Sequence, residues 1–172
     1  KIISRIDITN SPGTYPIYSS ARLNNGKFGE YGKYMFDEEL ITWSVDGGGG
    51  FFHRPRHKFS VTNVGGTLRV LDRNTIDCKY LFYALDHLHS RIRFDWVQKA
   101  HPSVIRRLYD SIPLPPLEEQ RRIVAILDKA DELRTKRREA IAKLDTLAQS
   151  IFIDMFGDPV TNPMGWEQCE LG

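Results

Sequence analysis

The densest group of side chains suited to bind a polyanion is the run His53-Arg54-Pro55-Arg56-His57-Lys58. Arginine binds the edge of a guanine through two hydrogen bonds, while lysine and histidine bind phosphate. Since the run holds five such residues within six positions, it predicts a DNA-facing element rather than a generic exposed turn. The candidate contacts are His53, Arg54, Arg56, His57 and Lys58.

Two further segments, 18–27 and 99–107, are rich in side chains that read bases or bind phosphate. The glycine run after Asp46 would let the backbone approach DNA closely, the alternative being a flexible hairpin loop. In the second segment, Ser103 is expected to cap a short helix. The candidate contacts in these places are Ser19, Ser20, Arg22, Asn24, Asn25, Lys27, Gly48, Gly49, Lys99, His101, Ser103, Arg106 and Arg107.

No spacing in the sequence is typical of catalysis or of metal binding. There is no Walker A loop and no Asn-Pro-Pro-Tyr methyltransferase motif. His53 and His57 are four residues apart, but Pro55 prevents a helix between them. His87 and His89 should point to different faces of a helix, and Cys78 and Cys169 are isolated thiols suited to a reducing cytoplasm. We therefore predict no catalytic residue, no metal site and no cofactor.

The elements that would position these residues follow from glycine-containing breaks and hydrophobic periodicity. A helix is expected at 76–93, with Thr75 or Asp77 as its cap, and a short helix at 103–109. The fold class is therefore α+β, with a mixed, small-stranded globule at 1–116. Its strands are expected at 15–19, 33–36, 40–45, 58–64 and 67–71.

A long helix is predicted at 117–156, because Pro115 and Pro116 prevent a helix before Leu117 and no glycine or proline follows before Gly157. At about 1.5 Å per residue this helix is ~60 Å long. Its heptad spacing of apolar residues favours an antiparallel coiled coil over packing against its own globule. The seam comprises Ile123, Ile126, Ala130, Leu133, Arg137, Ala140, Leu144, Leu147 and Ile151, with Arg137 as a polar layer.

The net charge of +2 is unevenly distributed. Residues 1–116 hold 16 basic and 11 acidic residues, and residues 117–156 hold eight of each. The excess of positive charge in the globule is modest support for a nucleic-acid partner. The apolar runs are too short to span a bilayer, so no membrane partner is expected.

The segment Ile112-Pro-Leu-Pro-Pro-Leu-Glu-Glu-Gln-Arg-Arg-Ile-Val124, followed by a long helix and Met155-Phe-Gly-Asp-Pro159, resembles the conserved region of DNA-specificity (S) subunits of type I restriction–modification systems. The resemblance implies a target-recognition domain at 1–116 that binds double-stranded DNA, followed by a spacer and dimerisation helix at 117–156. It also implies methyltransferase (M) subunits as partners and, through them, restriction (R) subunits. The chain by itself would be no enzyme.

The tail 157–172 resembles the start of a further recognition domain. In an antiparallel pair of helices, the far end of one helix lies beside the globule of the other chain. We therefore expect a C2 homodimer in which each tail completes the partner's domain, with Trp166 and Leu171 as apolar anchors. Such a dimer of half-subunits would read an inverted repeat with a fixed spacer.

Two other functions remain open from the sequence. The first is a scaffold that docks the methyltransferase and reads few bases. The second is a helical interaction protein without a role in DNA binding, which the basic run at 53–58 disfavours.

Overall fold

The computed structural model describes residues 3–20, 23–46, 50–92, 99–167 and 169. The chain forms two compact units, Lys1–Val124 and Ala125–Gly172. The candidate residues Arg22, Gly48, Gly49 and Leu171 lie outside the described residues.

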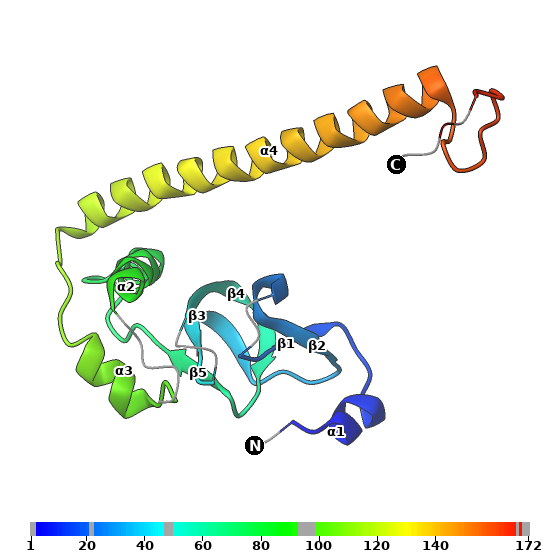
Figure 1. The fold of residues 1–172 in the computed structure, drawn as a ribbon. Coiled ribbons are helices and arrows are strands. Elements are labelled where there is room, and N and C mark those ends of the chain that lie inside the picture. The colour runs from blue at the N-terminus through cyan, green and yellow to red at the C-terminus, as the bar shows by residue number, and fades with distance from the viewer. Residues whose placement is uncertain (1–2, 21–22, 47–49, 93–98, 168, 170–172) are drawn as a thin grey trace. The chain divides into compact units, whose positions relative to one another are not determined.

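The first unit is a mixed five-stranded sheet with short helices (Figure 1). The strand order is β2-β1-β4-β3-β5, where β1 runs parallel to β4 and the other neighbours are antiparallel. This arrangement confirms the predicted α+β class. The elements are α1 (Arg5–Asn10), β1 (Tyr15–Tyr18), the 3-10 turn η1 (Leu23–Gly26), β2 (Lys27–Tyr31), β3 (Phe36–Ser44), β4 (Phe51–Val61), β5 (Gly65–Leu68), α2 (Cys78–Arg91), α3 (Pro102–Leu108) and α4 (Leu117–Phe156).

Strand β4 begins at Phe51 rather than at residue 58, because Pro55 lies at a bulge and does not end the strand. Glu38 pairs with His57 and Leu40 pairs with Arg54, so the register shifts between these two pairs. Proline is tolerated within a sheet at such a bulge, where its missing N–H leaves no ladder bond unmade. The basic run therefore forms part of a long central strand. Residues 33–36 do not form the separate strand that was expected, since only Phe36 lies in a strand, as the first residue of β3. Strand β2 was not predicted.

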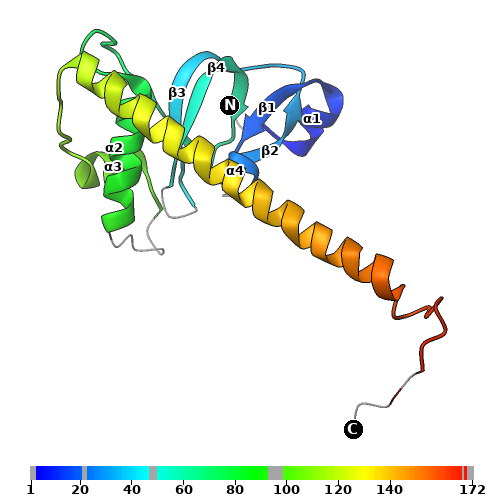
Figure 2. The same ribbon diagram turned by 90° about the horizontal axis from the view of Figure 1, so that it is seen from above.

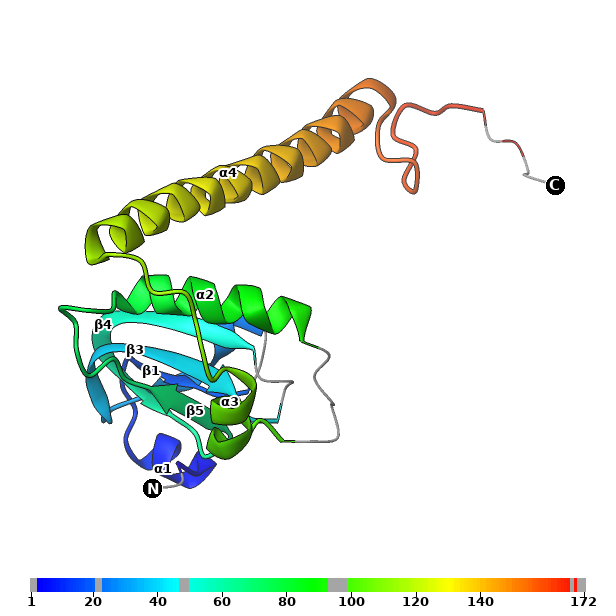
Figure 3. The same ribbon diagram turned by 90° about the vertical axis from the view of Figure 1, so that its left-hand side faces the viewer.

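Each face of the sheet has its own apolar core. Helix α2 covers one face (Figure 3), where Ile41, Trp43 and Phe51 pack against Cys78 and Leu85. On the other face the curled sheet encloses a second cluster, formed by Leu40, Phe59 and Val61 with Tyr18 and Phe36 packed against it. Alternate residues of β3 and β4 thus enter different cores, as the period of a strand requires.

The helix starts follow local capping rules, with one correction. Of the two caps that the sequence suggested, Thr75 and Asp77, it is Asp77 that caps α2, by accepting hydrogen bonds from the backbone N–H groups of Lys79 and Tyr80. In α3, however, the N-cap position is His101, Pro102 occupies the first turn and no side chain caps the helix. The prediction that Ser103 caps this helix is therefore wrong, because proline pre-sets the helical φ at the position before it.

Helix α4 begins at Leu117 and ends at Phe156, as predicted, and runs without a break (Figure 2). From Lys129 to Phe156 every residue is exposed, including the large apolar side chains. Gly157, the residue after the helix, terminates it: Gly157 has a φ of 76°, and its N–H donates to the Ile153 carbonyl at 2.7 Å. None of the described helices is both long enough and apolar enough to cross a membrane.

Candidate nucleic-acid interface

Because successive side chains of a strand point to opposite faces of the sheet, the basic residues of β4 do not lie side by side. His53 faces α2, and its Nε2 lies 2.8 Å from Glu39 Oε1. Arg56 is the most exposed of the run, with its Nε 3.7 Å from Asp37 Oδ1. The run is therefore not one continuous surface, although the sequence alone suggests that it is.

Arg54 is 1% exposed and lies inside the curled sheet. Its Nε donates to Thr42 Oγ1 at 3.0 Å, and its guanidinium carbon lies 3.6 Å from the centre of the Tyr18 ring and 4.8 Å from that of Phe52. Within the described part of the chain, Nη1 and Nη2 have no hydrogen-bond partner, and burial lowers the pKa of Arg54 to about 10. A side chain so enclosed has no surface to offer DNA, so we remove Arg54 from the candidate contacts.

His57 and Lys58 are half-buried among aromatic rings. The His57 ring stacks on Phe59 at 4.8 Å, and its Nε2 lies 3.0 Å from Tyr18 Oη. The Lys58 ammonium lies 4.8 Å from the centre of the Tyr34 ring, a cation–π contact. These contacts fix both side chains while leaving part of each accessible, so both remain candidates with Arg56.

The serines of the 18–27 loop attach that loop to the C-terminal end of β3 and to the residues between β4 and β5. Ser20 Oγ donates to the Val64 carbonyl at 3.2 Å, and the Ser20 carbonyl accepts from Ser44 Oγ at 2.9 Å. Ser19 Oγ accepts from Thr62 Oγ1 at 3.1 Å. Both serines are thus positioning groups. Among the loop residues whose exposure the structure describes, the exposed ones that could contact DNA are Asn24 and Asn25, with left-handed φ values of 50° and 54°, and Lys27, which pairs with Glu30 at 2.7 Å.

The segment before α3 is attached to the same end of β3. The Ala100 N–H donates to the Val45 carbonyl at 2.7 Å, and Trp43 Nε1 donates to the Ala100 carbonyl at 2.8 Å. Lys99 pairs with Asp46 at 3.2 Å and remains 70% exposed. Beyond these anchors, the accessible side chains are His101, Ser103, Arg106 and Arg107.

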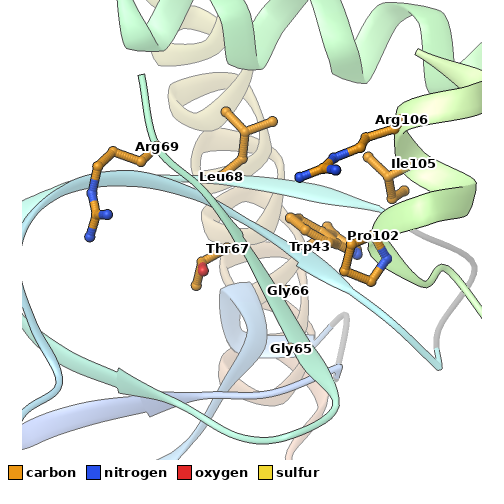
Figure 4. A pocket seen from close by; sticks show the side chains of 9 residues that line it. All are labelled: Trp43, Gly65, Gly66, Thr67, Leu68, Arg69, Pro102, Ile105 and Arg106. Atoms are coloured by element: carbon orange, nitrogen blue, oxygen red, sulfur yellow. The ribbon is translucent and has the colours of Figure 1, made fainter. Parts of the chain in front are cut away.

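A pocket of about 480 Å³ lies between the edge strand β5 and α3 (Figure 4). Gly66 lets β5 approach the Trp43 ring, because a Cβ at this position would lie 2.0 Å from the ring. Arg69 is bound to both carboxylate oxygens of Glu38, at 2.7 and 2.6 Å. Arg106 extends from α3 toward β5 and is exposed, as is Arg69, whose guanidinium is already paired with Glu38.

The fold thus collects the accessible candidates into two groups. The first group, Lys99, His101, Ser103, Arg106 and Arg107, lies near the end of β3, where Ser19 and Ser20 also hold the loop that carries Asn24, Asn25 and Lys27. The second group, Arg56, His57 and Lys58, lies beside the start of β3, since Glu38 pairs with His57. At about 3.3 Å per residue, the six steps from Glu38 to Ser44 separate the groups by ~20 Å along the strand.

Three possible metal ligands meet on the α2 face of the sheet. One donor atom each of Glu39, His53 and Cys78 lies within 4.8 Å of the other two. Burial raises the pKa of the Cys78 thiol to about 12. Sequence spacing did not reveal this group, because its members belong to three different elements.

Gln120 is a structural residue that the sequence analysis missed. It is fully buried, although glutamine is usually exposed. Gln120 lies in the Pro-Leu-Glu-Glu-Gln segment on which the family resemblance rests, and this position is the sequence feature that could have drawn attention to it.

The predicted seam of α4 is an exposed apolar stripe. Leu133 and Leu144 are 56% and 63% exposed, while Ile123, in the first unit, is half-buried. The other seam residues, Ile126, Ala130, Arg137, Ala140, Leu147 and Ile151, are also exposed. A stripe of this kind on a helix is typical of a protein interface. Its pairing in a coiled coil stays a prediction.

Trp166 has partners within its own unit. Its Nε1 donates to the Phe156 carbonyl at 3.1 Å, and its backbone forms two hydrogen bonds with the Asn162 side chain, at 2.8 and 2.9 Å. The indole therefore caps the end of α4 and is 58% exposed. The exchange of tails between two copies stays a prediction.

A putative type I specificity subunit of Mycoplasma pneumoniae, S.MpnORF285P, is 33% identical over 137 residues, which are 78% of this chain and 44% of the relative. A second one, S.MpnORF507P, is 32% identical over 143 residues, which are 82% of this chain and 39% of the relative. This chain thus spans less than half the length of these relatives.

The crystal structure of a type I restriction–modification system S subunit from M. genitalium shares the fold, with a TM-score of 0.58 and 22% identity. The match covers 91% of this chain and 40% of that one. In addition, residues 2–143 match the family described as the type I restriction modification DNA specificity domain. The resemblance inferred from residues 112–159 is therefore confirmed, and the chain belongs to the family of type I restriction–modification DNA specificity domains.

Proposed function

We propose that this chain recognises one half of a bipartite DNA site as the sequence-reading part of a type I restriction–modification complex, without catalytic activity of its own. The observation that carries the proposal is the family match over residues 2–143, which includes the whole sheet, α2 and α3. The accessible cations of the first unit agree with it, because they lie on segments that hydrogen bonds attach to the sheet.

Within this proposal, the two groups of candidates have different roles. Lys99, Arg106 and Arg107 are exposed and suited to phosphate, which positions a protein on the duplex without reading its sequence. Asn24 and Asn25, with their short amide side chains held at a tight turn, are suited to base edges. Arg56, His57 and Lys58 would contact DNA ~20 Å from the first group, measured along β3.

The long helix would fix the distance between two such readers. Two copies of α4 would pair antiparallel through the exposed stripe, forming a C2 dimer that recognises an inverted repeat with a spacer of fixed length. Methyltransferase subunits, and restriction subunits through them, would bind this dimer. The apolar stripe supports the pairing, because it would otherwise remain in contact with water.

Selection from a random DNA library at physiological salt tests the proposal. We expect two blocks of base preference, related by inversion and separated by a constant number of unselected positions. The blocks should persist in an Arg107→Gln variant with lower overall affinity if Arg107 binds phosphate. Binding without base preference at any position would contradict the proposal.

A scaffold that docks the methyltransferase but reads few bases is the second candidate, and the exposed stripe of α4 is the observation that favours it. The two functions differ in their response to salt. A scaffold would show only the steep, sequence-independent loss of DNA affinity that phosphate contacts produce. A reader would keep its ratio of specific to non-specific affinity as salt rises.

A further inference from the structure

We propose that Glu39, His53 and Cys78 form a binding site for a divalent transition-metal ion, with Zn²⁺ as the ion that fits best. The three residues lie on β3, on β4 and in the first turn of α2, and one donor atom of each lies within 4.8 Å of the other two. Such a site would join α2 to the sheet. It lies apart from the exposed cations assigned to DNA and does not depend on the proposed function.

The donor set selects the class of ion. A thiolate, an imidazole and a carboxylate are ligands that Zn²⁺ and Co²⁺ accept together, whereas Mg²⁺ and Ca²⁺ prefer oxygen ligands. Three protein ligands leave the fourth tetrahedral position to water. The thiolate and the carboxylate together balance the two positive charges of the ion, and the further positive charge at the site is that of Arg73, whose side chain is 52% exposed. Charge balance between the ion and its ligands favours binding here, because His53 and Glu39 are half-buried and Cys78 is 3% exposed.

The carboxylate of Glu39 is already oriented for this role. Arg73 Nη1 holds Glu39 Oε2 at 2.6 Å, and Arg73 Nη2 donates to the Glu39 backbone carbonyl at 3.1 Å. The other oxygen, Oε1, faces His53 Nε2 at 2.8 Å. Metal-bound carboxylates are typically held by an outer partner in this manner, which leaves one oxygen for the ion.

His53 and Cys78 are held by packing. The His53 ring lies 6.0 Å from the Phe82 ring of α2, and Cys78 follows Asp77, whose backbone N–H is bound by Gln120. Bond lengths of about 2.0–2.3 Å to the ion place tetrahedral ligand atoms roughly 3.3–3.8 Å apart. The donors, which lie within 4.8 Å of one another, would therefore move by up to roughly 1 Å, with His53 Nε2 and Glu39 Oε1 separating slightly from their 2.8 Å contact. On binding, the ion replaces the thiol proton of Cys78, which passes to solvent, and His53 binds as a neutral imidazole through a ring nitrogen that carries no proton.

The simpler account is an ion-pair cluster in which His53 and Arg73 share Glu39 and Cys78 is an apolar neighbour. Titration with Co²⁺ separates the two accounts, because a thiolate ligand gives a charge-transfer absorption band in the near ultraviolet. We expect one Co²⁺ per chain with this band. Cys78→Ser should abolish the band, and Cys169→Ser, which removes the exposed thiol, should retain it.

A second pair of variants guards against misfolding of the buried Cys78→Ser variant. His53→Gln should lower Zn²⁺ affinity at least tenfold, while His87→Gln, at an exposed position of α2, should leave it unchanged. Zn²⁺ should raise the Tm of the unsubstituted chain and of Cys169→Ser, because an ion that binds only the folded state stabilises it. Absence of the band, or a band and a Tm shift that survive both Cys78→Ser and His53→Gln, would overturn the proposal in favour of the ion-pair cluster.

Discussion

The side-chain carbonyl of Gln120 accepts a hydrogen bond from the backbone N–H of Asp77 at 2.9 Å. The same amide donates to the carbonyls of Thr75 and Pro115, at 2.9 and 2.8 Å. Since Asp77 also caps α2, one fully buried side chain joins the start of α2, the loop before it and the proline-rich segment before α4. Polar contacts therefore fix the first turn of α4 within the first unit.

Replacing Gln120 should destabilise the first unit. Gln120→Leu would leave a buried N–H and two carbonyls without their partner, and each unsatisfied group costs about 1–3 kcal/mol. We expect the free energy of unfolding in urea to fall by about 2–4 kcal/mol. Gln149→Leu, at an exposed position of the same helix, should change it by no more than about 0.5 kcal/mol. Equal effects of the two substitutions would show that the buried amide contributes no special stability.

The elements that local rules determine were predicted well. Proline chemistry defines the start of α4, and Asp77 caps α2 as its residue type indicates. The features that depend on distant partners were missed. The strand was predicted to begin only at residue 58, although pairing with β3 carries β4 through Pro55. Arg54 was predicted to face DNA, although Tyr18 and Phe52 enclose it. Glu39 and Cys78 are far apart in sequence and meet only through the fold.

Gly66 should not tolerate a side chain. A Cβ there would lie 2.0 Å from Trp43 Cε2, so the ring would have to move and weaken its 2.8 Å hydrogen bond to Ala100. We expect Gly66→Ala to lower the free energy of unfolding by about 3 kcal/mol. Gly29→Ala is the matched control, since no atom lies within 4 Å of its added Cβ. Similar unfolding curves for both variants would contradict the close approach of β5 to Trp43.

Tyr109 should contribute to loss of stability at alkaline pH. Burial and the charge of Asp86 raise the pKa of Tyr109 to about 12, and its hydroxyl lies 2.6 Å from His89 Nδ1. Because the unfolded chain ionises at a lower pH, the stabilisation is present below pH 10 and is lost as pH rises toward 12. We expect the free energy of unfolding to fall over this range by up to about 2 kcal/mol more than in Tyr109→Phe. Parallel pH profiles for the two chains would rule this out.

Arg106 should bind a DNA phosphate beside the pocket of Figure 4. Arg106→Gln would then weaken binding to all sequences alike and reduce the slope of log affinity against log salt by about 1. Fluorescence anisotropy with specific and non-specific duplexes at several salt concentrations measures both effects. Arg138→Gln, which removes the same charge from α4, should leave the slope unchanged. A selective loss for one duplex would show instead that Arg106 reads a base.

The pairing of α4 can be tested with one substitution made on two sides of the helix. Ala140 lies in the apolar stripe, and Ala142 lies about 200° further around the helix, on the opposite side; both are exposed in the single chain. Ala140→Glu would bring a carboxylate from each copy into the seam, whereas Ala142→Glu would place it in solvent. We expect light scattering to show a dimer for the unsubstituted chain and for Ala142→Glu, and a 19.8 kDa particle for Ala140→Glu. Arg137→Leu should strengthen the dimer, because an apolar residue replaces the polar layer. If the mass of every variant is that of a single chain, the stripe serves another partner, and if Ala140→Glu remains dimeric, the contact lies elsewhere on the molecule.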